Sequence, residues 1–101
     1  IAYDAYEKGL ALMDSAEVGN RVEYYEEAIN VFNGIVEEYE GTESALGALS
    51  NMGVCLEGIG KWNEAVRVYD QVIEMYEKEE ATRDAYQFAR SHRDWIIASR
   101  L

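Results

Sequence analysis

Apolar residues recur every three or four positions along most of this 101-residue chain, which is the spacing of amphipathic α-helices. Sustained alternation of apolar and polar residues, which would indicate strands, is missing. The pattern therefore predicts an all-α fold. We expect five helices, over about 2–17, 22–39, 43–59, 62–78 and 81–100.

Short polar breaks separate the predicted helices. Gly19 and Asn20 suit the C-terminal cap of the first helix. Thr42 or Ser44 can supply the N-terminal cap of the third helix. Because each connection spans only a few residues, neighbouring helices must run antiparallel, and the chain becomes a row of helical hairpins.

The second and fourth predicted helices repeat each other. A shift of 37 residues places 23–40 over 60–77, where six of 18 pairs are identical. A period in this range indicates a solenoid, in which each hairpin buries a face against the next copy. We expect one domain over 1–101. It holds a first repeat at about 2–40, a second at about 43–79 and a capping helix at about 81–100.

The stretch "LSNMGVCLEGIGKWNEAVRVYDQVIEMYE", residues 49–77, resembles a tetratricopeptide repeat. Met52 and Gly53 match the Leu-Gly pair of that pattern, and Ala65 and Tyr69 match its Ala and Phe. The closing proline is missing, and the period of 37 exceeds the usual 34. Such lengthened repeats resemble those of bacterial cell-envelope proteins, namely Tol-Pal coordinators and outer-membrane-assembly lipoproteins. The resemblance implies a right-handed α-solenoid that acts as a protein–protein interaction scaffold.

In proteins of this family, the first helix of each hairpin lines a concave groove that holds a partner peptide. The resemblance implies that the groove positions here are Tyr6, Leu10, Met13, Gly47, Ser50, Asn51, Val54, Glu57, Asp84, Gln87, Ser91 and Asp94. Either Gly9 or Ala16 can occupy the close-packing position of the first helix, and Tyr6 faces the groove under only one of these alignments. The stripe that Tyr6 forms with Tyr3, Leu10 and Met13 either packs on the second helix or is an apolar binding surface.

The groove lacks the charges that some members of the family use. A well-known version grips a C-terminal carboxylate with lysine, arginine and asparagine. Asn51 matches that asparagine, but Asp84 and Phe88 stand where basic residues would be. We therefore expect a neutral or basic peptide with apolar anchors as the partner, and no acidic tail.

The charge of the chain narrows the partners further. Nine Lys and Arg against 20 Asp and Glu give a net charge of −11, which repels nucleic acid and anionic lipid. No apolar run approaches the roughly 18 residues that direct membrane insertion requires. Residues 81–101 carry a net charge of +2 and the rest carries −13. An alternative function is therefore head-to-tail self-association through the fifth helix, with Ile97 and Leu101 on its outer face.

A further alternative is an accessory domain of a larger protein. The sequence begins at Ile1, which we interpret as an excised domain or a processed product. The sequence leaves the compartment open between the periplasm or cell envelope and the cytoplasm.

Residues that could carry chemistry are few. Cys55 is the single cysteine and is expected to be a buried thiol, and His92, the single histidine, a partly buried packing residue. One histidine rules out a helical di-iron site. The runs "EYYEE" at 23–27 and "EKEE" at 77–80 are interpreted as solvated acidic faces. We therefore expect no catalytic residue, no cofactor and no metal.

Overall fold

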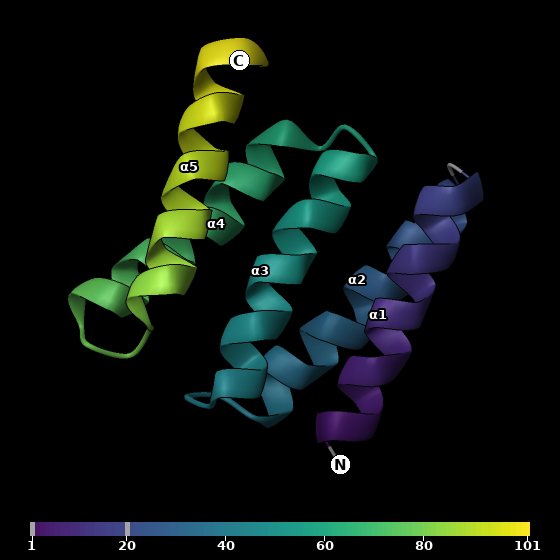
Figure 1. The fold of residues 1–101 in the computed structure, drawn as a ribbon, viewed down its shortest axis with the longest axis horizontal. Helices are drawn as coiled ribbons and strands as arrows, with labels where there is room; N and C mark the ends of the chain where they lie inside the picture. Colours follow the sequence, from purple (N-terminus) through teal and green to yellow (C-terminus); the bar gives the residue numbers. More distant parts are fainter. Residues whose placement is uncertain (1, 20) are drawn as a thin grey trace.

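The computed structural model describes residues 2–19 and 21–101, which form five α-helices (Figure 1). The helices are α1 (Ala2–Gly19), α2 (Val22–Glu38), α3 (Glu43–Gly58), α4 (Trp62–Glu77) and α5 (Arg83–Ser99). Each observed boundary lies within two residues of the predicted one. Asn20, which was expected to cap the first helix together with Gly19, lies outside the described residues.

The helices form an all-α solenoid of two layers. Each helix packs against the next in the chain, α1 also contacts α3, and α3 also contacts α5. Within the described part of the chain, no Cα atom of α2 lies within 8 Å of a Cα atom of α4. Figure 1 shows α1 and α5 in front of α2 and α4. We call α1, α3 and α5 the inner layer, and α2 and α4 the outer layer. The resulting slab measures 36 × 35 × 18 Å.

Threonine side chains cap two inner-layer helices. Thr42 Oγ1 accepts a hydrogen bond from the backbone N–H of Ala45 at 3.2 Å. This contact decides between the two predicted caps of α3, in favour of Thr42 over Ser44. Thr82 Oγ1 accepts from the backbone N–H of Ala85 at 3.2 Å in the same way. Each bond satisfies an N–H group that has no partner within its helix.

The same close contact occurs once in each hairpin. A Cβ atom added to Gly9 of α1 would lie 2.6 Å from the Phe32 ring of α2. A Cβ atom added to Gly53 of α3 would lie 2.4 Å from the Tyr69 ring of α4. Phe32 and Tyr69 are 37 residues apart, so they are equivalent positions of the repeat. Gly9, and not Ala16, is therefore the close-packing residue of the first helix.

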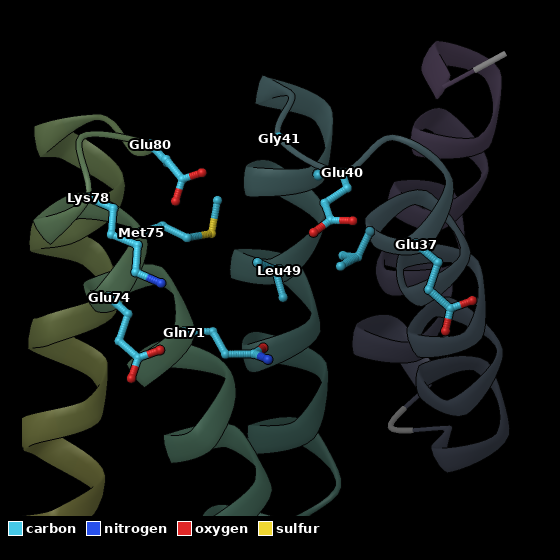
Figure 2. A pocket seen from close by; sticks show the side chains of 11 residues that line it. Glu37, Glu40, Gly41, Leu49, Gln71, Glu74, Met75, Lys78 and Glu80 are labelled. Carbon is cyan, nitrogen blue, oxygen red and sulfur yellow. The ribbon is translucent and has the colours of Figure 1, made fainter.

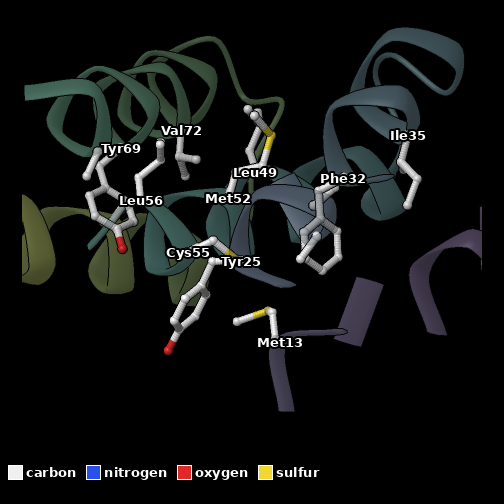
Figure 3. Close-up of a cluster of buried hydrophobic side chains, with 14 of the residues drawn as sticks. Met13, Tyr25, Phe32, Ile35, Leu49, Met52, Cys55, Leu56, Tyr69 and Val72 are labelled. Carbon is white, nitrogen blue, oxygen red and sulfur yellow. The ribbon is translucent and has the colours of Figure 1, made fainter. Parts of the chain in front are cut away.

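The core runs through all five helices. Its largest fully buried side chains are Tyr69, Phe32, Ile35, Ile96, Val72 and Cys55. Figure 3 shows how α2, α3 and α4 supply most of it, with Met13 reaching in from α1. Burial of this apolar surface supplies most of the stability, because no single hairpin can cover its own apolar face.

Candidate functional site

Most of the predicted groove residues lie on the three helices of the inner layer and are half-buried or exposed. On α3 they are all half-buried: Gly47, Ser50, Asn51, Val54 and Glu57. On α5 they are all exposed: Asp84, Gln87, Ser91 and Asp94. Tyr6 and Leu10 of α1 are half-buried. Because α3 contacts both α1 and α5, its residues form the middle of this layer and the other two helices flank it.

Met13 does not belong to this surface. Its side chain is only 7% exposed and lies in the core (Figure 3). Gly9, Met13 and Ala16 are all buried and follow one another at helical spacing, so they form the side of α1 that faces the core. The sequence-based assignment of Met13 to the groove is therefore corrected.

Tyr6 joins α1 to α3. Its hydroxyl oxygen accepts a hydrogen bond from Asn51 Nδ2 at 2.7 Å. Its ring also packs edge-on against Phe32 of α2, with the ring centroids 5.7 Å apart. Tyr6 thus contacts the second helix and also borders the inner face, whereas Tyr3 is 68% exposed. The packing alternative therefore holds for Tyr6, and the apolar binding surface stays a prediction for exposed Tyr3.

The amide group of Asn51 is already engaged within the protein. Besides its bond to Tyr6, Asn51 Nδ2 donates to the backbone carbonyl of Gly47 at 3.0 Å. An amide nitrogen carries two hydrogens, so neither remains to grip a partner's carboxylate.

A polar cluster joins α3, α4 and α5. The Tyr69 hydroxyl donates to Glu57 Oε2, and His92 Nδ1 lies 2.7 Å from the same carboxylate oxygen. Burial, and then the hydrogen bond to Glu57, raise the pKa of Tyr69 well above its usual value. His92 also stacks on Phe88, with the ring centroids 4.1 Å apart. His92 is thus partly buried and packed, as predicted, but its hydrogen bond to a residue 35 positions away was not predicted.

A hollow of about 400 Å³ lies beside this cluster. It is lined by Glu57 of α3 and by Ser91, His92 and Trp95 of α5. Glu57 and Ser91 were both predicted groove residues, and the structure brings them together here.

Large aromatic side chains flank the small residues of α3. Phe88 and Trp95 of α5 are 38% and 46% exposed. Phe88 lies 37 positions after Asn51 and is therefore its equivalent on α5. Tyr3 lies 44 positions before Gly47. The same spacing of 44 relates Gly9 to Gly53, so Tyr3 is the equivalent of Gly47 on α1. The outer helices of the inner layer therefore carry aromatics where α3 carries small or polar residues. We call this part of the inner layer, with the small residues of α3 between the aromatics of α1 and α5, the trough.

A second depression, which sequence reasoning missed, lies on the opposite face between α2 and α4 (Figure 2). Its volume is about 380 Å³. Apolar side chains of three helices line its floor: Val36, Ala45, Leu49 and Met75. Charged side chains line its rim: Glu37, Glu40, Glu74, Lys78 and Glu80. We call this depression and its continuation along α2 and α4 the outer groove.

Cys55 lies apart from both surfaces. Its side chain is fully buried and forms no disulfide. Burial raises the pKa of the thiol to about 12, so the reactive thiolate is scarce at neutral pH. The expectation of a buried, inert thiol agrees with this environment.

The described residues contain neither a candidate metal site nor a candidate membrane-spanning helix. Within 2–19 and 21–101, no group of three or more Asp, Glu, His or Cys side chains lies close enough to hold a metal ion. In the same segments, no helix combines the length and apolarity that crossing a bilayer requires.

Comparison with known families supports the repeat. Residues 48–87 match the tetratricopeptide repeat, and this match runs from α3 through α4 into α5. No curated protein and no solved structure gives a significant match to the chain. Tetratricopeptide repeats in general form protein–protein interaction modules, and they are typically non-catalytic scaffolds. The match gives no support to the narrower cell-envelope subtype, which stays a prediction.

Proposed function

We propose that the inner face binds an extended or helical segment of a partner protein, held by apolar anchor residues. The observation that carries this proposal is the trough, in which exposed Tyr3, Phe88 and Trp95 flank the small residues of α3. Aromatic side chains lose little conformational entropy on binding and offer large contact areas, so they are frequent binding hot spots.

The charges around the trough favour a neutral or basic partner. Asp84 is exposed on α5 and Glu7 is exposed on α1. Asp94 is neutralised, since it pairs with Arg90 at 3.8 Å and with Arg93 at 3.0 Å. With the amide of Asn51 engaged, no donor arrangement for an acidic tail remains on α3.

The test is selection of binding peptides from a random display library, followed by affinity measurement with variants. Val54→Arg places a long charged side chain in the trough floor and should weaken binding about tenfold or more. The matched control is Val18→Arg, because Val18 is 92% exposed near the end of α1 and should tolerate the same change without effect. Circular dichroism should show equal helicity for both variants.

Phe88→Ala provides an independent measurement if Val54→Arg lowers stability. Phe88 is 38% exposed, so its removal should weaken peptide binding, and the lost packing on Tyr69 and His92 is measured separately as the change in the free energy of unfolding. Selected peptides whose affinity is unchanged by both Val54→Arg and Phe88→Ala would place the binding surface elsewhere.

A further inference from the structure

The outer groove lies between two helix ends of the same polarity. Because α2 and α4 are each antiparallel to α3, they are parallel to each other and their C-terminal ends lie at the same edge of the slab (Figure 1). The negative end of each helix dipole favours a cation in the last turn. Neither last turn contains a basic residue, and Lys78, the C-cap of α4, is the one basic side chain of the rim.

Carboxylates occupy the positions that would suit cations. Glu37 and Glu40 approach the groove from α2 and the turn after it, and Glu74 and Glu80 from α4 and the turn after it (Figure 2). With Lys78, the rim carries a net charge of −3. Within the described part of the chain, none of these four glutamates forms an ion pair. Like charges thus face each other across the groove, next to two negative helix ends.

The floor of the groove is apolar and longer than one side chain. Leu49 and Met75 line the first hollow, and Gln71 is shared with a second hollow of about 370 Å³. The second hollow adds Met52 and Leu56 of α3 to the floor. The floor therefore follows α3 along the space between α2 and α4, where no helix covers it.

We propose that the outer groove docks a basic amphipathic helix of a partner protein. Apolar side chains of that helix enter the two hollows, and its Lys or Arg side chains reach the glutamates of the rim. Charge complementarity selects this occupant for two reasons. A cationic side chain reduces the repulsion between the glutamates of the two walls, and it interacts favourably with the negative ends of the two helix dipoles. The rim glutamates are spread over both walls and form no cluster suited to a metal ion. This surface is separate from the inner face, so the proposal stands independently of the function proposed above.

The experiment uses a fluorescein-labelled probe peptide of about 18 residues, with leucines on one helical face and lysines on the other. Its affinity for the intact chain is measured by fluorescence anisotropy, beside a matched peptide that has Glu in place of Lys. We expect the lysine peptide to bind, the glutamate peptide to fail, and higher salt to weaken binding.

Because any basic peptide is attracted to a chain of net charge −11, the decisive comparison is between two variants of equal charge. Glu40→Gln with Glu74→Gln removes two rim charges, and Asp14→Asn with Glu17→Gln removes two exposed charges of α1, outside the groove. Both double variants have a net charge of −9, since each loses two of the 11 excess negative charges. The rim variant should bind about tenfold more weakly than the control variant. Equal affinities for the two variants would overturn the proposal.

Gln71→Lys gives a second measurement with two opposed readouts. Gln71 is exposed at the junction of the two hollows, so the new ammonium group lies among the rim carboxylates. The variant should melt at a higher temperature and bind the lysine peptide more weakly. An unchanged or tighter affinity would contradict the proposal.

Sedimentation of the wild type tests a second copy as the occupant. Exposed Arg83, Arg90 and Arg100 make α5 and the residue after it the basic part of the chain. Concentration-dependent association that is abolished in the Glu40→Gln/Glu74→Gln variant would assign the groove to α5 of another copy and overturn the partner-protein proposal. A monomer at all concentrations supports it.

Discussion

The two hairpins share their packing but differ in how each is joined to the next inner-layer helix. Gly9 meets Phe32 in the first hairpin, and Gly53 meets Tyr69 in the second. The joint between α1 and α3 is the neutral hydrogen bond from Asn51 to Tyr6. The joint between α3 and α5 is built on the carboxylate of Glu57, which contacts His92 of α5 and also accepts a hydrogen bond from Tyr69 of α4. The repeat therefore preserves close packing, while the polar joints between repeats vary.

A second pair of equivalent contacts shows how the end of the solenoid differs. Tyr25 of α2 packs on Gly58 of α3, where an added Cβ would lie 2.7 Å from the ring. The equivalent pair 37 residues later is Trp62 and Trp95, with the ring centroids 6.1 Å apart. The Arg100 guanidinium lies 5.1 and 5.3 Å from these two rings. Bulk has thus replaced the glycine contact on α5.

The same shift places Arg90 on α5 where α3 has Gly53. A helix that packed on α5 as α4 packs on α3 would have to displace this arginine. Ile97 and Leu101 are 49% and 59% exposed, as the head-to-tail alternative requires. Any contact that these two residues make would therefore differ in geometry from the contacts within the solenoid.

The largest expected effect concerns the close contact in the second hairpin. Gly53→Ala forces a methyl group into the Tyr69 ring and should lower the free energy of unfolding by about 2–3 kcal/mol, measured by urea denaturation. Gly9→Ala should cost less, because the gap is 2.6 Å against 2.4 Å and Phe32 has no hydroxyl to anchor its ring.

The control for this substitution is Gly34→Ala in α2. Nothing lies within 4 Å of an added Cβ at Gly34, so the higher helix propensity of alanine should stabilise the protein by about 0.5–1 kcal/mol. If Gly53→Ala proved as stable as Gly34→Ala, the contact of Gly53 with Tyr69 would not require a glycine, and the proposed close packing in the second hairpin would be wrong.

The next largest effect concerns the ionisable joint. Tyr69→Phe removes the hydroxyl that donates to Glu57 and should cost about 2 kcal/mol, since hydrogen bonds to charged groups contribute more than neutral ones. Tyr39→Phe is the control, because Tyr39 is half-buried and its hydroxyl has no partner within the described residues. A loss for Tyr69→Phe no larger than for the control would show that the joint carries no net stabilisation.

Alkaline pH should also act on the second hairpin. The pKa of Cys55 is about 12 in the folded protein against 9.0 when unperturbed, so the unfolded chain loses this proton first. The stabilisation is complete below pH 9 and is lost as the pH rises from 9 towards 12, by about 1.4 kcal/mol per pH unit. Tyr69, whose pKa is also raised, acts in the same direction. Cys55→Ala should flatten this slope in urea denaturation measured across the pH range, and an unchanged slope would exclude the thiol as its cause.

The sequence predicted the helices and the repeat well because both depend on local spacing. Asn33-Gly34, a pair that favours hairpin turns, lies instead inside α2, where Phe32 and Ile35 on either side are buried. Burial of these neighbours overrides the turn preference of the pair. The alignment of the first helix could not be decided, because Gly9 and Ala16 are both small and both buried. Only the contact with Phe32 distinguishes them.

The candidate surfaces were predicted less completely, since they depend on contacts between distant segments. Tyr6 and Asn51 are 45 residues apart, and Glu57 and His92 are 35 apart, so no local pattern pairs them. The outer groove was missed because the second helices were interpreted as scaffold and "EKEE" as a solvated face. The available signal was the set of carboxylates near the ends of both helices, namely Glu37, Glu40, Glu74 and Glu80.

The smallest expected effect concerns the neutral joint between α1 and α3. Tyr6→Phe removes one hydrogen bond between neutral groups and should lower the free energy of unfolding by about 1 kcal/mol. Because Phe keeps the ring contact with Phe32, the loss reports the hydroxyl alone. A double-mutant cycle with Asn51→Ala should return a coupling energy of about 0.5–1 kcal/mol. A coupling energy as large as that between Tyr69 and Glu57 would remove the distinction between the two joints.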